Sequence, residues 1–149
     1  MATYLIDYEN TKNLTGIDKL NEEDKVVIFY SKNSNSLTFE THKAIMASPA
    51  KVDYKYVAVG GKSALDVQLS TYLGYLIKEN KTTSNYFVVS GDTCFNYLIG
   101  FWKDEKNVHL EILPALNSKP AKKETEVKAP KKEEEKEKEA PKADEKAAQ

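Results

Sequence analysis

Three aspartates stand at points of the sequence where a folded chain can bind a ligand. Asp7 and Asp92 each come shortly after an apolar run, and Asp66 lies near the beginning of a longer amphipathic segment. Carboxylates are preferred protein ligands of Mg²⁺ and Mn²⁺, and a cation held by several of them promotes hydrolysis of phosphate esters. Metal-assisted phosphate chemistry is therefore the hypothesis, provided that the fold brings the three side chains together.

The apolar runs that carry these residues are typical of buried strands. Residues 3–6, 25–30 and 85–89 are almost continuously apolar and rich in β-branched and aromatic side chains, as in strands that are covered on both faces. Residues 52–59 and 108–113 are two further candidates. The sequence thus predicts five strands.

Apolar residues at helical spacing fill the intervals between these strands. The pattern is clearest over 64–79, and it also predicts helices at 36–47 and 93–103 and a short one at 13–21, although Gly16 lies within the last. Strands that alternate with helices imply right-handed crossovers and a parallel sheet. The expected fold class is α/β, a three-layer α/β/α sandwich around a central, mainly parallel five-stranded sheet.

Polar residues gather at the carboxyl ends of the expected strands. In open parallel sheets, ligands bind outside these ends, near the point at which the strand order reverses. Residues 7–10, 31–33 and 90–93 follow three of the strands, and Asp66 comes after the glycines that follow another. Acidic groups from three separate segments are therefore expected at one edge of the sheet.

Each aspartate also has a purely structural explanation. Asp7 fits an Asx turn, Asp66 fits a capping box that begins at Ser63, and Asp92 fits the N-cap of the last helix. If all three converge, however, like charges this close cannot all stay ionised without compensation. A divalent cation is the obvious compensating charge, and oxygen ligands favour Mg²⁺ or Mn²⁺ over zinc.

Histidine and cysteine give no competing metal site. The sequence contains two histidines, His42 and His109, which we expect at the surface or in packing contacts. The single cysteine, Cys94, is expected as a small core residue. One cysteine also excludes an intramolecular disulfide.

Two other phosphate-handling patterns are incomplete. Residues 60–63 match the last four positions of a phosphate-binding P-loop, but Tyr56 stands where its first glycine belongs. Asp7 and Glu9 resemble the Asp-x-Asp of haloacid dehalogenase phosphatases, with glutamate in place of the second aspartate. A nucleotide-binding or phosphatase sandwich therefore stays an alternative. We interpret residues 60–63 as a helix entry with Ser63 as its cap, and Lys62 is still a candidate contact for a substrate phosphate.

The composition divides the 149 residues into two parts. We assign residues 1–116 to one domain and residues 117–149 to a disordered tail rich in Lys, Glu, Ala and Pro, which holds 10 lysines, nine acidic residues and no aromatic one. The formal net charge of the whole chain is −1, and arginine is absent. Net charge thus gives no support for nucleic-acid binding, and phosphate contacts from charged side chains must come from lysine.

Three segments resemble, in order and spacing, the motifs of bacterial PIN-like domains related to the NYN ribonucleases. They are residues 5–10, residues 63–75 and residues 90–95, and the likeness covers about 3–113. The resemblance implies a PIN-like sandwich that uses Mg²⁺ or Mn²⁺ to hydrolyse RNA phosphodiester bonds.

The same resemblance implies roles for individual residues. Asp7, Asp66 and Asp92 match the family's catalytic acids, and Glu9 is an additional ligand. A further acid usual in such proteins is replaced by Asn96, which can coordinate a cation through its carbonyl oxygen but adds no charge. The candidate substrate contacts are Asn10, Ser31, Lys32, Lys62, Ser90 and Thr93.

Two functions stay open at this point. One is a cytoplasmic metal-dependent ribonuclease, and the other is a catalytically weak or inactive module of the same fold that binds nucleic acid or metal. The expected partner is RNA, single-stranded or structured, and no membrane, since no apolar run has the length of a signal peptide or a membrane span. A homodimer and a protein partner bound through the tail are the further partners that we consider.

Overall fold

The computed structural model describes residues 1–58, 61, 63–80 and 85–118. Five strands form one sheet in the order β3-β2-β1-β4-β5, and every neighbouring pair is parallel. The strand order reverses at β1, because the chain adds β2 and β3 on one side and β4 and β5 on the other. The strands are β1 (Ala2–Asp7), β2 (Lys25–Ser31), β3 (Lys51–Val57), β4 (Asn85–Val89) and β5 (Leu110–Leu113).

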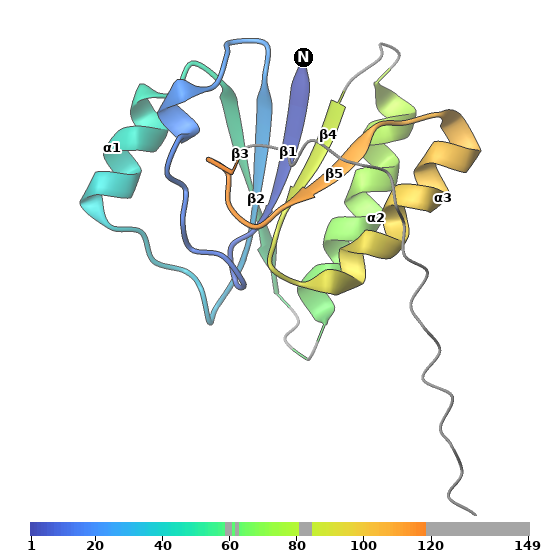
Figure 1. Cartoon of the computed structure of the whole chain (residues 1–149). Coiled ribbons are helices and arrows are strands. Elements are labelled where there is room, and N and C mark those ends of the chain that lie inside the picture. Colours follow the sequence, from blue (N-terminus) through green and yellow to red (C-terminus); the bar gives the residue numbers. More distant parts are fainter. Residues whose placement is uncertain (59–60, 62, 81–84, 119–149) are drawn as a thin grey trace, which may run out of the picture.

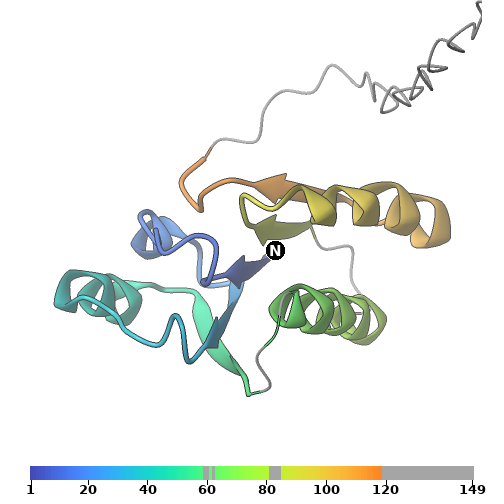
Figure 2. The same ribbon diagram turned by 90° about the horizontal axis from the view of Figure 1, so that it is seen from below.

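Helices cover both faces of this sheet. The helix α1 (Phe39–Ala47) and the short 3₁₀ turn η1 (Ile17–Lys19) lie on one face, and α2 (Ala64–Glu79) and α3 (Asn96–Lys106) lie on the other (Figures 1 and 2). The 3₁₀ turn η2 (Thr93–Phe95) leads directly into α3. The predicted three-layer α/β/α sandwich with a parallel five-stranded sheet is thus confirmed.

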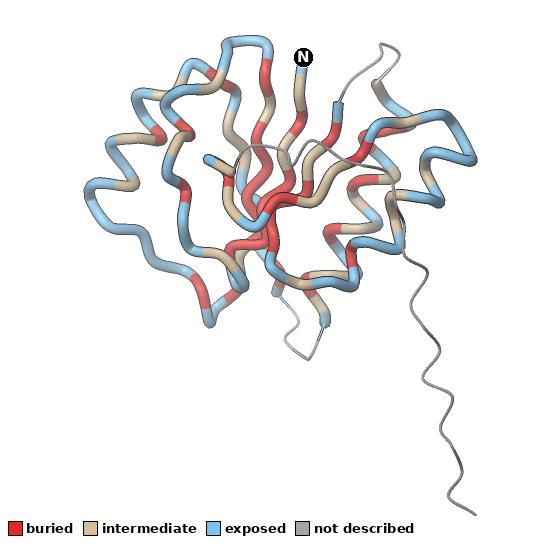
Figure 3. The backbone as a smooth tube through the Cα atoms, in the orientation of Figure 1, coloured by how far each residue is buried: buried red, intermediate tan, exposed pale blue. Residues whose placement is uncertain are grey.

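The central strands are buried on both sides, which is why their sequences are apolar throughout. Leu5 and Val27 belong to the core on the α2 side, whereas Ile6 and Ile28, one residue further along, belong to the core on the α1 side. Figure 3 shows this buried band running through the middle of the sheet. The alternating direction of side chains along a strand places successive residues in opposite layers.

Three predicted helices have different bounds in the structure. The segment 13–21 forms only η1, and Gly16 before it has a φ of +97°, a conformation that interrupts a helix. The helix α1 begins at Phe39 because the Thr38 hydroxyl caps it by accepting from the amide of Thr41. The predicted helix 93–103 is η2 followed by α3, which continues to Lys106.

The described part of the chain packs as far as Leu116, which is buried in the core on the α1 side. Residues 119–149 lie outside the described residues, as does Val59 at the end of the predicted third strand. The domain boundary at 116 therefore stays a prediction. No helix in the ranges that the structure describes has both the length and the hydrophobicity needed to cross a bilayer.

We predict that Leu69→Ala lowers the free energy of unfolding by about 2–5 kcal/mol, because it leaves a cavity beneath α2. Leu69 is fully buried between α2 and the sheet. Val67→Ala is the matched control on the same helix, at a side chain that is 64% exposed. Urea unfolding measures both variants, and equal losses would show that α2 does not pack on the sheet as described.

Candidate active site

The neighbouring strands β1 and β4 end side by side, where the strand order reverses. Asp7 is the last residue of β1, and only 3% of this residue is exposed. One of its oxygens, Oδ2, accepts a hydrogen bond from the Ser90 hydroxyl at 2.9 Å, and Oδ1 accepts from the amide of Asn10 at 3.1 Å. Asp7 is therefore held in one orientation by the loops that follow both strands.

Further hydrogen bonds tie these two loops together. The Oδ1 atom of Asn10 accepts from the amide of Gly91 at 2.9 Å, and the Ser90 oxygen accepts from the amide of Asp92 at 3.0 Å. A Cβ atom added at Gly91 would lie 2.9 Å from the same Asn10 oxygen, so the loops approach as closely as glycine allows. The result is a rigid support beneath the acidic residues.

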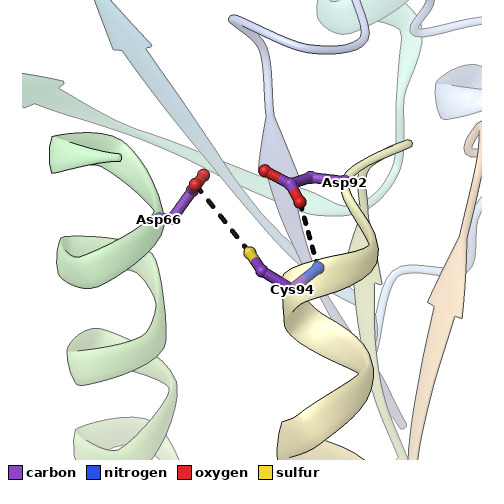
Figure 4. Close-up of side chains that lie close together, drawn as sticks. All are labelled: Asp66, Asp92 and Cys94. Carbon is purple, nitrogen blue, oxygen red and sulfur yellow. Dashed lines mark hydrogen bonds between the residues drawn. The ribbon is translucent and has the colours of Figure 1, made fainter. Parts of the chain in front are cut away.

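Asp92 has the capping role that the sequence predicted. Its Oδ1 atom accepts from the amide of Cys94 at 3.0 Å at the start of η2 (Figure 4). Hydrogen bonds from the backbone amide and the side chain of Cys94 lower the pKa of the Asp92 carboxyl. Asp92 is therefore a carboxylate at neutral pH even though other acids lie close by.

The predicted capping box at the start of α2 is wrong. Ser63 has a φ of 68°, in the left-handed region, and its side chain makes no capping hydrogen bond. Asp66 therefore does not take part in a capping box with Ser63. It lies in the first turn of α2 and faces Asp92 and Cys94 across the gap between α2 and η2 (Figure 4).

All three aspartates line one cavity of about 250 Å³, which we call the acidic cavity. No basic side chain is among its lining residues in the part of the chain that the structure describes. The remaining lining residues are Glu9, Asn10, Gly61, Ser63 and Leu65. Four carboxylates thus surround a single space without a described positive charge, so a divalent cation fits the chemistry of the lining.

The electrostatic strain of this arrangement appears at Asp66. Burial, together with the charges of Asp7 and Asp92, raises the pKa of the Asp66 carboxyl to about 6. Burial also raises the pKa of Asp7, although the hydrogen bonds from Ser90 and Asn10 oppose that shift. Both shifts mean that the ionised forms of these acids are unfavourable without a compensating cation.

Cys94 differs from its prediction as a small core residue. Its side chain is exposed, and its sulfur lies 3.8 Å from an Asp66 carboxylate oxygen. Ligand atoms of Asp66, Asp92 and Cys94 all lie within 4.8 Å of one another. Desolvation and the neighbouring carboxylates raise the pKa of the thiol to about 12, so the sulfur is protonated at neutral pH and is a poor nucleophile.

The other predicted site residues lie at different distances from the acidic cavity. Glu9 and Asn10 line it. Ser31 and Lys32 line an adjoining cavity of about 280 Å³, the loop cavity, which shares Glu9, Gly61 and Leu65 with the acidic cavity. Lys62 lies outside the described residues.

Asn96, Thr93 and Ser90 do not line the acidic cavity. Asn96 and Thr93 are exposed at the junction of η2 and α3. Ser90 is buried, and its hydroxyl is engaged with Asp7 and Asp92. The two histidines are exposed, and His109 lies 3.0 Å from a carboxylate oxygen of Glu111 on the edge strand β5.

Comparison with known proteins adds one family. A family model described as PIN domain matches residues 1–110. A curated relative, the chromosomal replication initiator protein DnaA of Caldanaerobacter subterraneus subsp. tengcongensis, is 29% identical over 102 residues, which are 68% of this chain and 23% of that protein. The chain thus spans about a quarter of the length of that relative. No solved structure matches.

We predict that the metal-free protein loses stability as the pH rises from about 4 to about 7, because Asp66 must ionise in the folded state. The contribution of a carboxyl with a raised pKa to folding stability is fully present below the unfolded pKa of 3.8, and it is lost progressively as the pH rises through the folded pKa of about 6. In the presence of EDTA, Asp66→Asn should remove this loss. Allowing for solvent screening, the variant gains about 1 kcal/mol at pH 7, or roughly 4 °C in melting temperature.

The control is Asp18→Asn, at an exposed aspartate in η1 outside the acidic cavity. Its melting temperature should follow that of the wild type across the pH series. Thermal melts in which Asp66→Asn is less stable than wild type at neutral pH would contradict the crowding of carboxylates.

Proposed function

Because the chain belongs to the PIN domain family, we propose that it is a metal-dependent ribonuclease that hydrolyses RNA phosphodiester bonds at the acidic cavity. PIN domains are generally metal-dependent nucleases. The specific relation to the NYN ribonucleases, the RNA substrate and a cytoplasmic location are part of this proposal. The observation that carries it is the convergence of Asp7, Asp66 and Asp92, from three separate segments, on one cavity.

The proposed cation ligands are Asp7, Asp66 and Asp92, with Glu9 as a fourth acid in the same lining. Asp66 is the most informative of them. It has no capping role, and burial together with the two other aspartates raises its pKa, so its carboxylate is placed where charge is costly. The dipole of α2 favours an acid in its first turn, but it does not explain why this acid faces two other aspartates, whereas a bound cation does.

When bound, Mg²⁺ or Mn²⁺ supplies a nucleophilic water at neutral pH and offsets the negative charge that develops on the phosphate. The chain's own part is to fix the ligands in advance. Ser90 and the amide of Asn10 orient the Asp7 carboxylate, and the amide of Cys94 orients Asp92. We propose Ser90 as a positioning residue, because its buried hydroxyl is already engaged.

Substrate contacts are proposed along the exposed rim of the same edge. Lys32 is exposed and lines the loop cavity, so its ammonium group can contact an RNA phosphate next to the acidic cavity. Thr93 and Lys62 are proposed contacts on sequence grounds, and Lys62 lies outside the described residues. Asn10 lines the acidic cavity, and its side-chain oxygen accepts a hydrogen bond from the backbone amide of Gly91.

A second candidate function is a module of the same fold that binds metal or nucleic acid without turnover. The position of Asn96 favours it, because this replacement for a further acid is exposed and lies outside the acidic cavity lining. A site with fewer charged ligands holds a second cation less well. The nuclease is preferred because the three acids and Glu9 are all present at the cavity.

We predict that the purified protein cleaves single-stranded RNA in the presence of Mn²⁺, and that Asp66→Asn lowers the cleavage rate by at least about 100-fold. Loss of one charged ligand removes several kcal/mol of charge stabilisation. Gel analysis of a labelled RNA measures the rate, and melting temperatures show that the variant is folded.

Two further variants make this experiment decisive. Cys94→Ser should retain cleavage, because the protonated thiol carries no charge to the site, and Asp18→Asn should be indistinguishable from wild type. Equal inertness of wild type and Asp66→Asn over several RNAs and metals would favour the binding module. Unfolding of Asp66→Asn would instead show that the carboxylate is structural.

A further inference from the structure

A second hollow lies on the α1 face of the sheet, beside the carboxyl end of β2. It has a volume of about 220 Å³, and three tyrosine rings line it together with the loop that follows β2. We call it the tyrosine cavity. Its rings belong to Tyr8, Tyr30 and Tyr54, and polar groups of Ser34, Asn35 and Ser36 complete much of its wall.

The tyrosine rings are held in place before any ligand binds. The Tyr8 hydroxyl donates to the carbonyl oxygen of Ser36 at 2.8 Å. Tyr30 packs edge-on against Tyr54, with ring centroids 6.3 Å apart, and at 5.2 Å from Tyr56 in a tilted arrangement. Such preordered rings lose little conformational freedom when a flat ligand stacks on them.

Two tyrosines of β3, of which Tyr54 lines the tyrosine cavity, are about half exposed. Tyr54 is 46% exposed and Tyr56 is 52% exposed. Both point to the same face of the edge strand β3, because they are two residues apart. Exposed aromatic rings beside a cavity are more typical of a binding surface than of a folding core.

The tyrosine cavity is linked to the acidic cavity by the loop after β2. Residues 31–33 line the loop cavity, which shares Glu9, Gly61 and Leu65 with the acidic cavity. Residues 34–37, which follow directly, line the tyrosine cavity. The loop after β2 thus contributes to two of the three hollows, and the exposed Lys32 lines the loop cavity, which adjoins the acidic cavity.

From this juxtaposition we propose that the tyrosine cavity and Tyr56 form a base-stacking subsite for single-stranded RNA, which holds nucleotides that flank the phosphate to be cleaved. This inference rests on the proposed function and names its substrate class. Unpaired bases offer flat faces that stack on aromatic rings and polar edges that hydrogen-bond to serine and asparagine groups. In this arrangement, the ammonium group of Lys32 contacts a phosphate that lies along the RNA between the stacked bases and the nucleotide bound at the acidic cavity.

The chemistry of the lining favours a nucleobase over a peptide segment. Six of its eight lining residues are tyrosines or small polar residues, and the other two are the aliphatic Ile28 and Leu37. A helix or strand of a protein partner would instead need a wider apolar groove. Paired bases keep their faces stacked within the duplex, so the subsite selects single strands.

Binding without turnover tests this inference separately from catalysis. The Asp66→Asn protein is titrated into a fluorescein-labelled single-stranded oligoadenylate, and fluorescence anisotropy gives the dissociation constant. Adding Tyr54→Ala or Tyr56→Ala should weaken binding by about tenfold each, whereas Tyr54→Phe should bind as tightly as the parent, because the ring is retained. The matched control is Tyr75→Ala, at a similarly exposed tyrosine that packs on Tyr72 in α2.

Each outcome separates the two proposals. Weaker binding by the alanine variants supports the subsite even if the wild type cleaves no RNA with any metal. Undiminished binding by the alanine variants overturns it, even if cleavage is observed. Absence of oligoadenylate binding by the parent, equal binding of a duplex, or equal losses with Tyr75→Ala also overturns it. Circular dichroism confirms that each variant is folded.

Discussion

Carboxylates that share one small space repel each other unless a positive charge lies between them. The parallel sheet creates this condition, because the carboxyl ends of β1 and β4 meet where the strand order reverses. Asp7 and Asp92 come from these ends, and α2 brings Asp66 to the same cavity. Holding these three carboxylates close together lowers the stability of the fold, and such a loss of stability is typical of functional sites.

Rigidity at the acidic cavity comes from hydrogen bonds between the loops. Ser90 links Asp7 to the backbone of Asp92, and Asn10 links its own loop to Gly91. These contacts fix the ligands before a cation arrives, so little ordering has to accompany binding. The tyrosine cavity is built in the same way, since Tyr8 is anchored to the loop carbonyl of Ser36. Both hollows thus depend on the loops at one edge of the sheet.

Much of this arrangement could be predicted from the sequence, because burial of the strands on both faces leaves a strong apolar pattern. The helix over 64–79 and the gathering of acids at one edge followed from it. Local conformation was harder to predict: Ser63 adopts a left-handed backbone instead of capping α2, and the short turn η2 exposes Cys94 beside Asp66. The proposed base-stacking subsite, which joins the tyrosine cavity and Tyr56, depends on the strand register that pairs Tyr30 with Tyr56, and spacing along the chain does not determine this register.

The most direct test of the acidic cavity is a crystal structure of the protein soaked in Mn²⁺, with data collected at the manganese absorption edge. Anomalous density inside the cavity, within coordination distance of carboxylate oxygens from Asp7, Asp66 and Asp92, is the predicted result. Density bound elsewhere, or a fully soaked crystal with the three side chains turned away from an empty cavity, would contradict it.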